Sequence, residues 1–128
     1  MNQYLLDTNY ILRYLLNDIP KQADIAENYF QKAKDGRISI AVSLFASIEC
    51  IFILTKVYGF EKNKIVKELS SFAKLPYLDI EKRELIIKSL SLYQKTNLGF
   101  VDILFLLEAI TNNKKLLTFD KKLSKMDL

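Results

Sequence analysis

Short uncharged segments alternate with longer segments of helical spacing along this chain, and this alternation constrains the fold more than any other feature. The uncharged segments lie at residues 4–6, 38–42 and 116–119, with a weaker one at 77–78. Alternation of this kind predicts a parallel sheet with helices on both faces. We therefore expect one α/β domain over residues 1–128, with three layers (α/β/α) and a short central parallel sheet of four or five strands.

The helices between these segments carry recognisable start and stop signals. Asp7, Pro20 and Ser43 are residue types that favour a helix start, and Gly36 and Gly59 favour a helix end. Apolar residues at helical spacing fill the intervals. Helices are expected to follow residues 7–9 and Asp120, and to cover about 20–35, 44–58, 61–75, 80–95 and 100–112, with Asp79 capping the helix from Ile80.

Two residue types that carry much of enzyme chemistry are missing or nearly missing. The chain has no His and a single Cys, Cys50. Ser-His-Asp triads, Cys-His pairs, His-ligated metals, Cys₄ zinc sites and intrachain disulfides are therefore excluded. The N-terminus lacks the basic region of a signal peptide, and Asp7 interrupts its apolar run. We expect a cytoplasmic protein, with which the cysteine content is compatible.

Four acidic residues stand in uncharged surroundings, and they are the candidate catalytic residues. They are Asp7, Glu49, Asp102 and Asp120. Positions one helical turn from Glu49 hold Phe45 and Phe52, and none of the corresponding positions around Asp102 holds Lys or Arg. A buried carboxylate without a partner costs several kcal/mol or takes up a proton. Each acid alone has an ordinary explanation as a cap, a turn residue or a partner of a distant base, but four together favour a site.

A divalent cation would make a cluster of these acids favourable. Two carboxylates about 4 Å apart repel by roughly 4 kcal/mol at an effective dielectric near 20, and a cation between them reverses the sign. Oxygen ligands select hard ions, so Mg²⁺ or Mn²⁺ is the expected metal. Asp7 and Asp120 follow the first and last expected strands, and sites in open parallel sheets form at those ends.

The net charge of +4, from 19 Lys and Arg against 15 Asp and Glu, adds a second indication. A basic body around an acidic pocket suits a polyanionic substrate, but a lysine-rich solubilising surface is the more common cause of such a charge.

The segments around the four acids resemble a known family. Residues 5–9 (LLDTN), 43–49 (SLFASIE), 99–102 (GFVD) and 117–123 (LTFDKKL) are similar, in order, to the four acidic motifs of PIN-domain ribonucleases. Length and architecture are most like VapC-type toxins of prokaryotic toxin–antitoxin pairs. The resemblance implies a Mg²⁺- or Mn²⁺-dependent endoribonuclease that cleaves structured RNA such as tRNA. It also implies a homodimer and a cognate antitoxin. Some relatives carry a further acid where this chain has Leu106.

A hypothesis for the mechanism assigns roles to individual residues. Asp7 and Asp102 would hold the principal metal, with Asp120 and Glu49 as direct or water-mediated ligands, and a metal-activated water would attack the phosphate. Asn9 and Thr118 could orient carboxylates or the water through hydrogen bonds. The cations that could contact RNA phosphates are Arg13, Lys121, Lys122 and Lys125.

Three other functions fit parts of the same pattern. A phosphatase of the haloacid dehalogenase type needs a second Asp two positions after the first, where this chain has Asn9. A catalytically inactive PIN-like module would bind RNA or a protein partner without metal-dependent turnover. A PIN-domain nuclease of RNA maturation would share the chemistry of a toxin and differ in genomic context.

Overall fold

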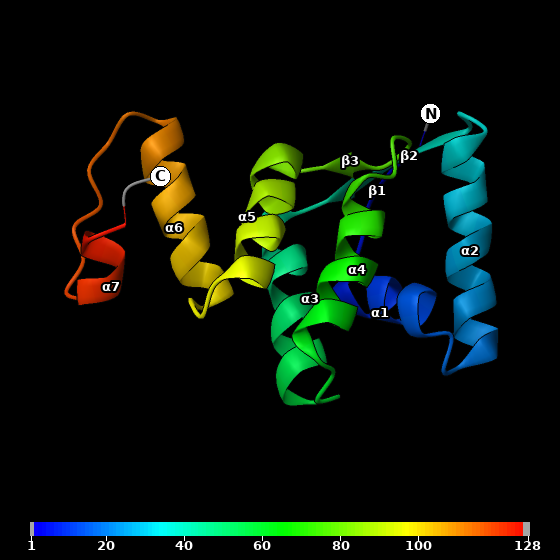
Figure 1. Cartoon of the computed structure of the whole chain (residues 1–128). Coiled ribbons are helices and arrows are strands. Elements are labelled where there is room, and N and C mark those ends of the chain that lie inside the picture. The colour runs from blue at the N-terminus through cyan, green and yellow to red at the C-terminus, as the bar shows by residue number, and fades with distance from the viewer. Residues whose placement is uncertain (1, 127–128) are drawn as a thin grey trace.

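The structure is a computed structural model, and it describes residues 2–126. In chain order the elements are β1 (Asn2–Leu5), α1 (Thr8–Leu16), α2 (Pro20–Lys34), β2 (Ile38–Val42), α3 (Leu44–Lys56), α4 (Lys62–Ala73), β3 (Asp79–Ile80), α5 (Arg83–Lys95), α6 (Phe100–Thr111) and α7 (Lys121–Ser124). Strands alternate with helices in the first two thirds of the chain, and helices alone follow β3 (Figure 1).

The three strands form one parallel sheet in the order β1-β2-β3, which confirms the predicted α/β class. Tyr4 lies beside Ile40 in the register of β1 and β2, and Val42 lies beside Ile80 in that of β2 and β3. Helices α1 and α2 connect the first two strands, and α3 and α4 connect the second to the third. Crossovers of this length are what parallel strands require.

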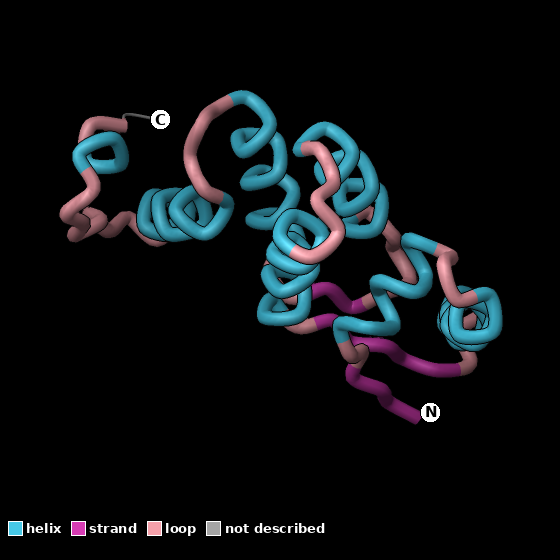
Figure 2. Tube along the Cα trace, turned by 90° about the horizontal axis from the view of Figure 1, so that it is seen from below, coloured by secondary structure: helices cyan, strands magenta, loops and turns pink. Residues whose placement is uncertain are grey.

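The predicted number of strands is wrong for the part of the chain described. Four or five were expected, and three are present between residues 2 and 126 because residues 116–119 pair with no strand there. A segment this short becomes a strand only when a neighbouring strand accepts and donates its backbone hydrogen bonds. Figures 1 and 2 place the C-terminal segment at the opposite end of the molecule from β1.

The third strand also begins later than predicted, at Asp79 rather than Tyr77. Asp79 therefore does not cap a helix, and α5 starts at Arg83. The Arg83 guanidinium explains this shift, because it donates to the carbonyls of Ala73 at 2.6 Å and Leu75 at 2.8 Å and also to that of Leu78. These bonds hold residues 73–78 in a turn.

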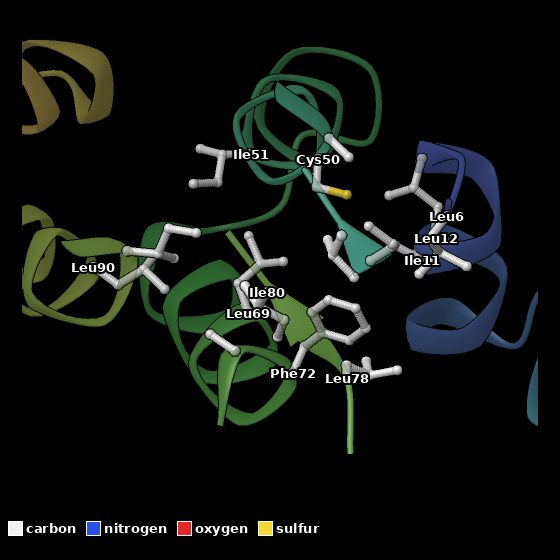
Figure 3. Packing of buried hydrophobic residues seen from close by; sticks show 14 of the residues in the cluster. Leu6, Ile11, Leu12, Cys50, Ile51, Leu69, Phe72, Leu78, Ile80 and Leu90 are labelled. Atoms are coloured by element: carbon white, nitrogen blue, oxygen red, sulfur yellow. The ribbon is translucent and has the colours of Figure 1, made fainter. Parts of the chain in front are cut away.

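The main hydrophobic core lies between the sheet and helices α1 to α5. Figure 3 shows side chains from α1, α3, α4, α5 and β3, including Leu12, Phe72 and Ile80, pointing into one cluster. Cys50 of α3 is fully buried there, and burial, with the nearby Glu49 charge as the second cause, raises the pKa of its thiol to about 12. This residue is therefore a neutral core thiol.

A second, smaller cluster holds the C-terminal helices together. Its buried members are Leu98, Ile103, Leu106 and Leu123. Helix α6 also contacts the main core through Phe100 and Leu104. As a result α6 packs on α5, and α7 packs on α6, on the far side of α5 from β1 and α1 (Figures 1 and 2).

None of the helices between residues 2 and 126 has the length and apolar character needed to cross a membrane.

Candidate functional site

Asp7 lies two residues beyond the end of β1 and caps helix α1. Its carboxylate Oδ1 accepts the backbone N–H of Asn9 at 2.7 Å, as a helix N-cap does. The side chain is exposed and lines a groove of about 610 Å³ together with Asn9, Tyr10 and Arg13. The N-cap bond uses Oδ1, and the exposed Asp7 side chain remains accessible from this groove.

Asp120 has the same local role at the other end of the chain. Its Oδ1 accepts the backbone N–H groups of Lys122 at 2.8 Å and Leu123 at 3.2 Å, which caps α7. Its own backbone N–H donates to Thr118 Oγ1 at 3.1 Å. Thr118 therefore holds the backbone at Asp120, whereas its predicted role of orienting a carboxylate or a water stays a prediction.

The other two candidate acids project from the middle and the start of longer helices. Glu49 is exposed on α3, where Ser43 caps the helix by accepting the Ala46 N–H at 3.1 Å. Asp102 is half-buried in the first turn of α6. A β-carbon at Gly99 would lie 3.4 Å from Asp102 Oδ2, so the carboxylate folds back over the helix N-terminus. There the helix dipole favours a negative charge.

The structure does not bring these four carboxylates together within one chain. Over residues 2–126, no group of three or more His, Cys, Asp or Glu side chains is close enough to hold a metal ion. Asp7 lies at the start of α1, whereas Asp102 and Asp120 lie on α6 and at the start of α7, beyond α5 as seen from α1 (Figure 1). Their oxygen donors suit Mg²⁺ or Mn²⁺, but their placement in a single chain does not.

Lysine and arginine do not neutralise these acids either. The ion pairs in the described part of the chain are Arg13–Asp18, Arg37–Asp35 and Lys82–Glu108, and none includes a candidate acid. Between residues 2 and 126, none of the four carboxylates therefore has a lysine or arginine at ion-pair distance. A basic partner for each acid, the simplest alternative to a metal site, is not what the structure shows.

Uncovered apolar side chains border all four acids. Their exposed fractions are 73% for Leu5, 79% for Phe45, 60% for Phe52, 59% for Phe105, 96% for Leu117 and 106% for Phe119. Large apolar groups exposed in contiguous patches mark surfaces that another molecule or segment covers. Each of the four acids therefore has at least one exposed large apolar side chain close to it in the sequence.

The candidate RNA-binding cations differ in availability. Arg13 is half-buried and donates to Asp18 Oδ2 at 3.1 Å and to the Tyr58 hydroxyl at 2.8 Å, so it ties α1 to the end of α3. Lys121, Lys122 and Lys125 are exposed on and just after α7. The three lysines are free to approach a phosphate, whereas the Arg13 guanidinium already has two partners.

One further carboxylate, which the sequence analysis did not single out, lies just after the carboxyl end of a strand, as Asp7 does. Glu81 follows β3, and its Oε1 accepts the Leu44 N–H at 2.8 Å at the start of α3. An acid directly after a strand was the available signal. Leu106, where some relatives have an acid, is buried in the C-terminal cluster.

The family model of the PIN domain matches residues 4–128, which is nearly the whole chain and includes all four candidate acids. A search of curated proteins found no match.

Proposed function

This chain belongs to the PIN domain family, whose members are generally nucleases that use a divalent metal, and on that premise we propose that it is a Mg²⁺- or Mn²⁺-dependent endoribonuclease. The observation that supports this most is the set of four acids within the matched region, none of them in an ion pair over residues 2–126. Carboxylates that are not already paired with lysine or arginine are suitable ligands for a hard cation.

The proposed roles follow the sequence prediction. Asp7 and Asp102 are the principal metal ligands, with Asp120 and Glu49 as direct or water-mediated ligands. Asn9 and Thr118 are supporting residues, and the hydrogen bond from the Asp120 N–H to Thr118 supports the second assignment. One chain does not gather these acids over residues 2–126, so the site needs either another placement of α6 and α7 in the same chain or a second chain.

For the biological role we propose a cytoplasmic, single-domain toxin of a toxin–antitoxin pair. It forms a homodimer, acts on tRNA or another structured RNA, and is blocked by a cognate antitoxin. The similarity of residues 5–9, 43–49, 99–102 and 117–123, in order, to the PIN motifs supports this role. A small antitoxin gene directly upstream would favour a toxin over an RNA-maturation nuclease.

Metal-dependent cleavage of RNA by the purified protein tests the enzymatic part of the proposal. We expect structured RNA to be cut when Mg²⁺ or Mn²⁺ is present, to stay intact with EDTA, and to be cut again after the metal is restored. RNA that is bound but stays intact with either metal would identify an inactive binding module instead.

Charge reversal at Lys121 and Lys122 should weaken the salt dependence of RNA binding. If each lysine contacts one phosphate, the slope of log affinity against log salt concentration falls by between about 1 and 2 when both become glutamate. The control is Lys21→Glu with Lys34→Glu on α2, exposed residues with the same change of charge. Equal slopes for the two double variants would show that Lys121 and Lys122 do not contact RNA phosphates.

A further inference from the structure

We propose that two copies of this chain exchange their C-terminal parts, so that residues 116–119 of one copy add a strand to β1 of the other. Each candidate site then combines Asp7 and Glu49 of one copy with Asp102 and Asp120 of its partner. This inference rests on the proposed function for the chemistry of the site, but its geometry stands on separate observations.

The free edge of β1 is the first observation. In the described sheet β1 pairs with β2 alone, and all four of its residues are exposed. Natural edge strands are protected from pairing by charged residues, proline or a bulge. The β1 sequence Asn-Gln-Tyr-Leu has neither a charge nor a proline. This edge is therefore suited to receive another strand.

The C-terminal segment supplies a matching strand. Residues 116–119 read Leu-Leu-Thr-Phe, an uncharged sequence rich in strand-favouring types. Leu117 and Phe119 are fully exposed, whereas Leu116 packs on the C-terminal cluster. Adding an extended segment to a free sheet edge satisfies the backbone groups of both partners. When the segment pairs in parallel, as the other strands of the sheet do, Asp120 comes to the carboxyl end of β1, where Asp7 lies.

The faces of α3 and α6 give the third observation. On α3 the exposed Phe45 and Phe52 flank Glu49, and on α6 the exposed Val101 and Phe105 flank Asp102. These two bare apolar faces come from the two halves that the exchange would join. Packing one against the other covers both and places their acids at one interface.

Contacts within the chain favour exchange between two copies over closure within one. Helix α6 packs on α5 through Phe100 against Tyr93, with ring centroids 5.8 Å apart, and Glu108 of α6 also pairs at 3.0 Å with Lys82, which precedes α5. For residues 116–119 to reach β1 of the same chain, α6 would have to leave these partners. A second copy can supply the strand with all of them intact, and two-fold symmetry then gives two identical sites.

Complementation between two inactive variants tests the exchange. In a mixed dimer of Asp7→Asn and Asp102→Asn subunits, one site carries both substitutions and the other carries none. Co-expressed at equal levels, the pair should recover about one quarter of wild-type cleavage, since half of the dimers are mixed and each has one intact site of two. If wild type cleaves RNA and the mixture stays inactive, the exchange is wrong and the proposed function stands.

A measurement of mass tests the exchange without using activity. Wild type should be a dimer by light scattering, and Leu117→Ser with Phe119→Ser should be a folded monomer, because both side chains are fully exposed in the single chain. The control pair Ile19→Ser with Val57→Ser, also exposed, should stay dimeric. A monomeric wild type, or a Leu117 and Phe119 variant that remains dimeric, would overturn the exchange. A dimer that behaves as expected without any cleavage would refute only the proposed function.

Discussion

Asp7→Asn should lower the rate of metal-dependent RNA cleavage at least about 100-fold and leave the fold intact. Loss of a residue that merely orients a metal ligand typically costs 10- to 100-fold, so loss of a ligand charge should cost at least the upper value. Asparagine caps helices as well as aspartate does. It can therefore keep the bond from the Asn9 N–H, which is 2.7 Å long in the wild type. Cleavage rates and unfolding free energies of both proteins measure the two effects separately.

Ser43→Ala is the matched control for the capping role of Asp7. Ser43 caps α3 through the Ala46 N–H and carries no charge. Its loss should cost about 1 kcal/mol of stability, as cap removal usually does, while cleavage by the folded protein continues. If Asp7→Asn cleaved RNA at the wild-type rate, Asp7 would be a helix cap and nothing more.

Arg83→Met should lower the free energy of unfolding by roughly 2 to 5 kcal/mol. The guanidinium donates to three backbone carbonyls, those of Ala73, Leu75 and Leu78, and methionine keeps much of its bulk but none of its donors. A carbonyl left without a partner costs about 1 to 3 kcal/mol when buried, and partial access to water reduces the sum. Urea unfolding of the two proteins gives the difference.

Arg37→Met is the control for the loss of a guanidinium as such. Arg37 pairs with Asp35 at 3.4 Å, and both side chains are exposed. Surface pairs of this kind contribute less than about 1 kcal/mol. Comparable destabilisation by the two substitutions would show that the turn at residues 73–78 does not depend on Arg83.

The sequence predicted those parts of the fold that local chemistry decides. Helix starts at Asp7, Pro20 and Ser43 came from capping and first-turn preferences, and the structure confirms all three. The strand at 38–42 is confirmed with its exact limits. These features depend on neighbouring residues, so local sequence patterns are sufficient to predict them.

The errors lie where distant residues decide the conformation. Asp79 is a residue type that often caps helices, but it belongs to β3. The bonds from Arg83 that hold the preceding turn join residues eight and ten positions apart and leave no pattern in the sequence. Residues 116–119 have the composition of a strand, but composition cannot show whether a free strand lies within reach, and these residues pair with none between residues 2 and 126.

In the candidate site too, the features set by neighbouring residues were predicted and those set by distant residues were not. That Asp7 and Asp120 follow the expected strands and start helices was predicted, and their capping bonds are present. The predicted gathering of four acids depends on how the two ends of the chain meet, and one chain with α6 fixed on α5 does not bring them together. Bare apolar residues beside each acid could not be foreseen from the sequence, because their exposure results from that packing.

Binding of Mn²⁺, followed by electron paramagnetic resonance, tests most directly whether acids from both ends of the chain share one ion. We expect wild type to bind Mn²⁺, Asp7→Asn and Asp102→Asn each to lose that binding, and Glu61→Gln to keep it. Glu61 is an exposed acid at the start of α4 whose side chain makes no capping bond. Wild-type Mn²⁺ binding by Asp7→Asn or by Asp102→Asn would show that these two residues do not hold a common metal.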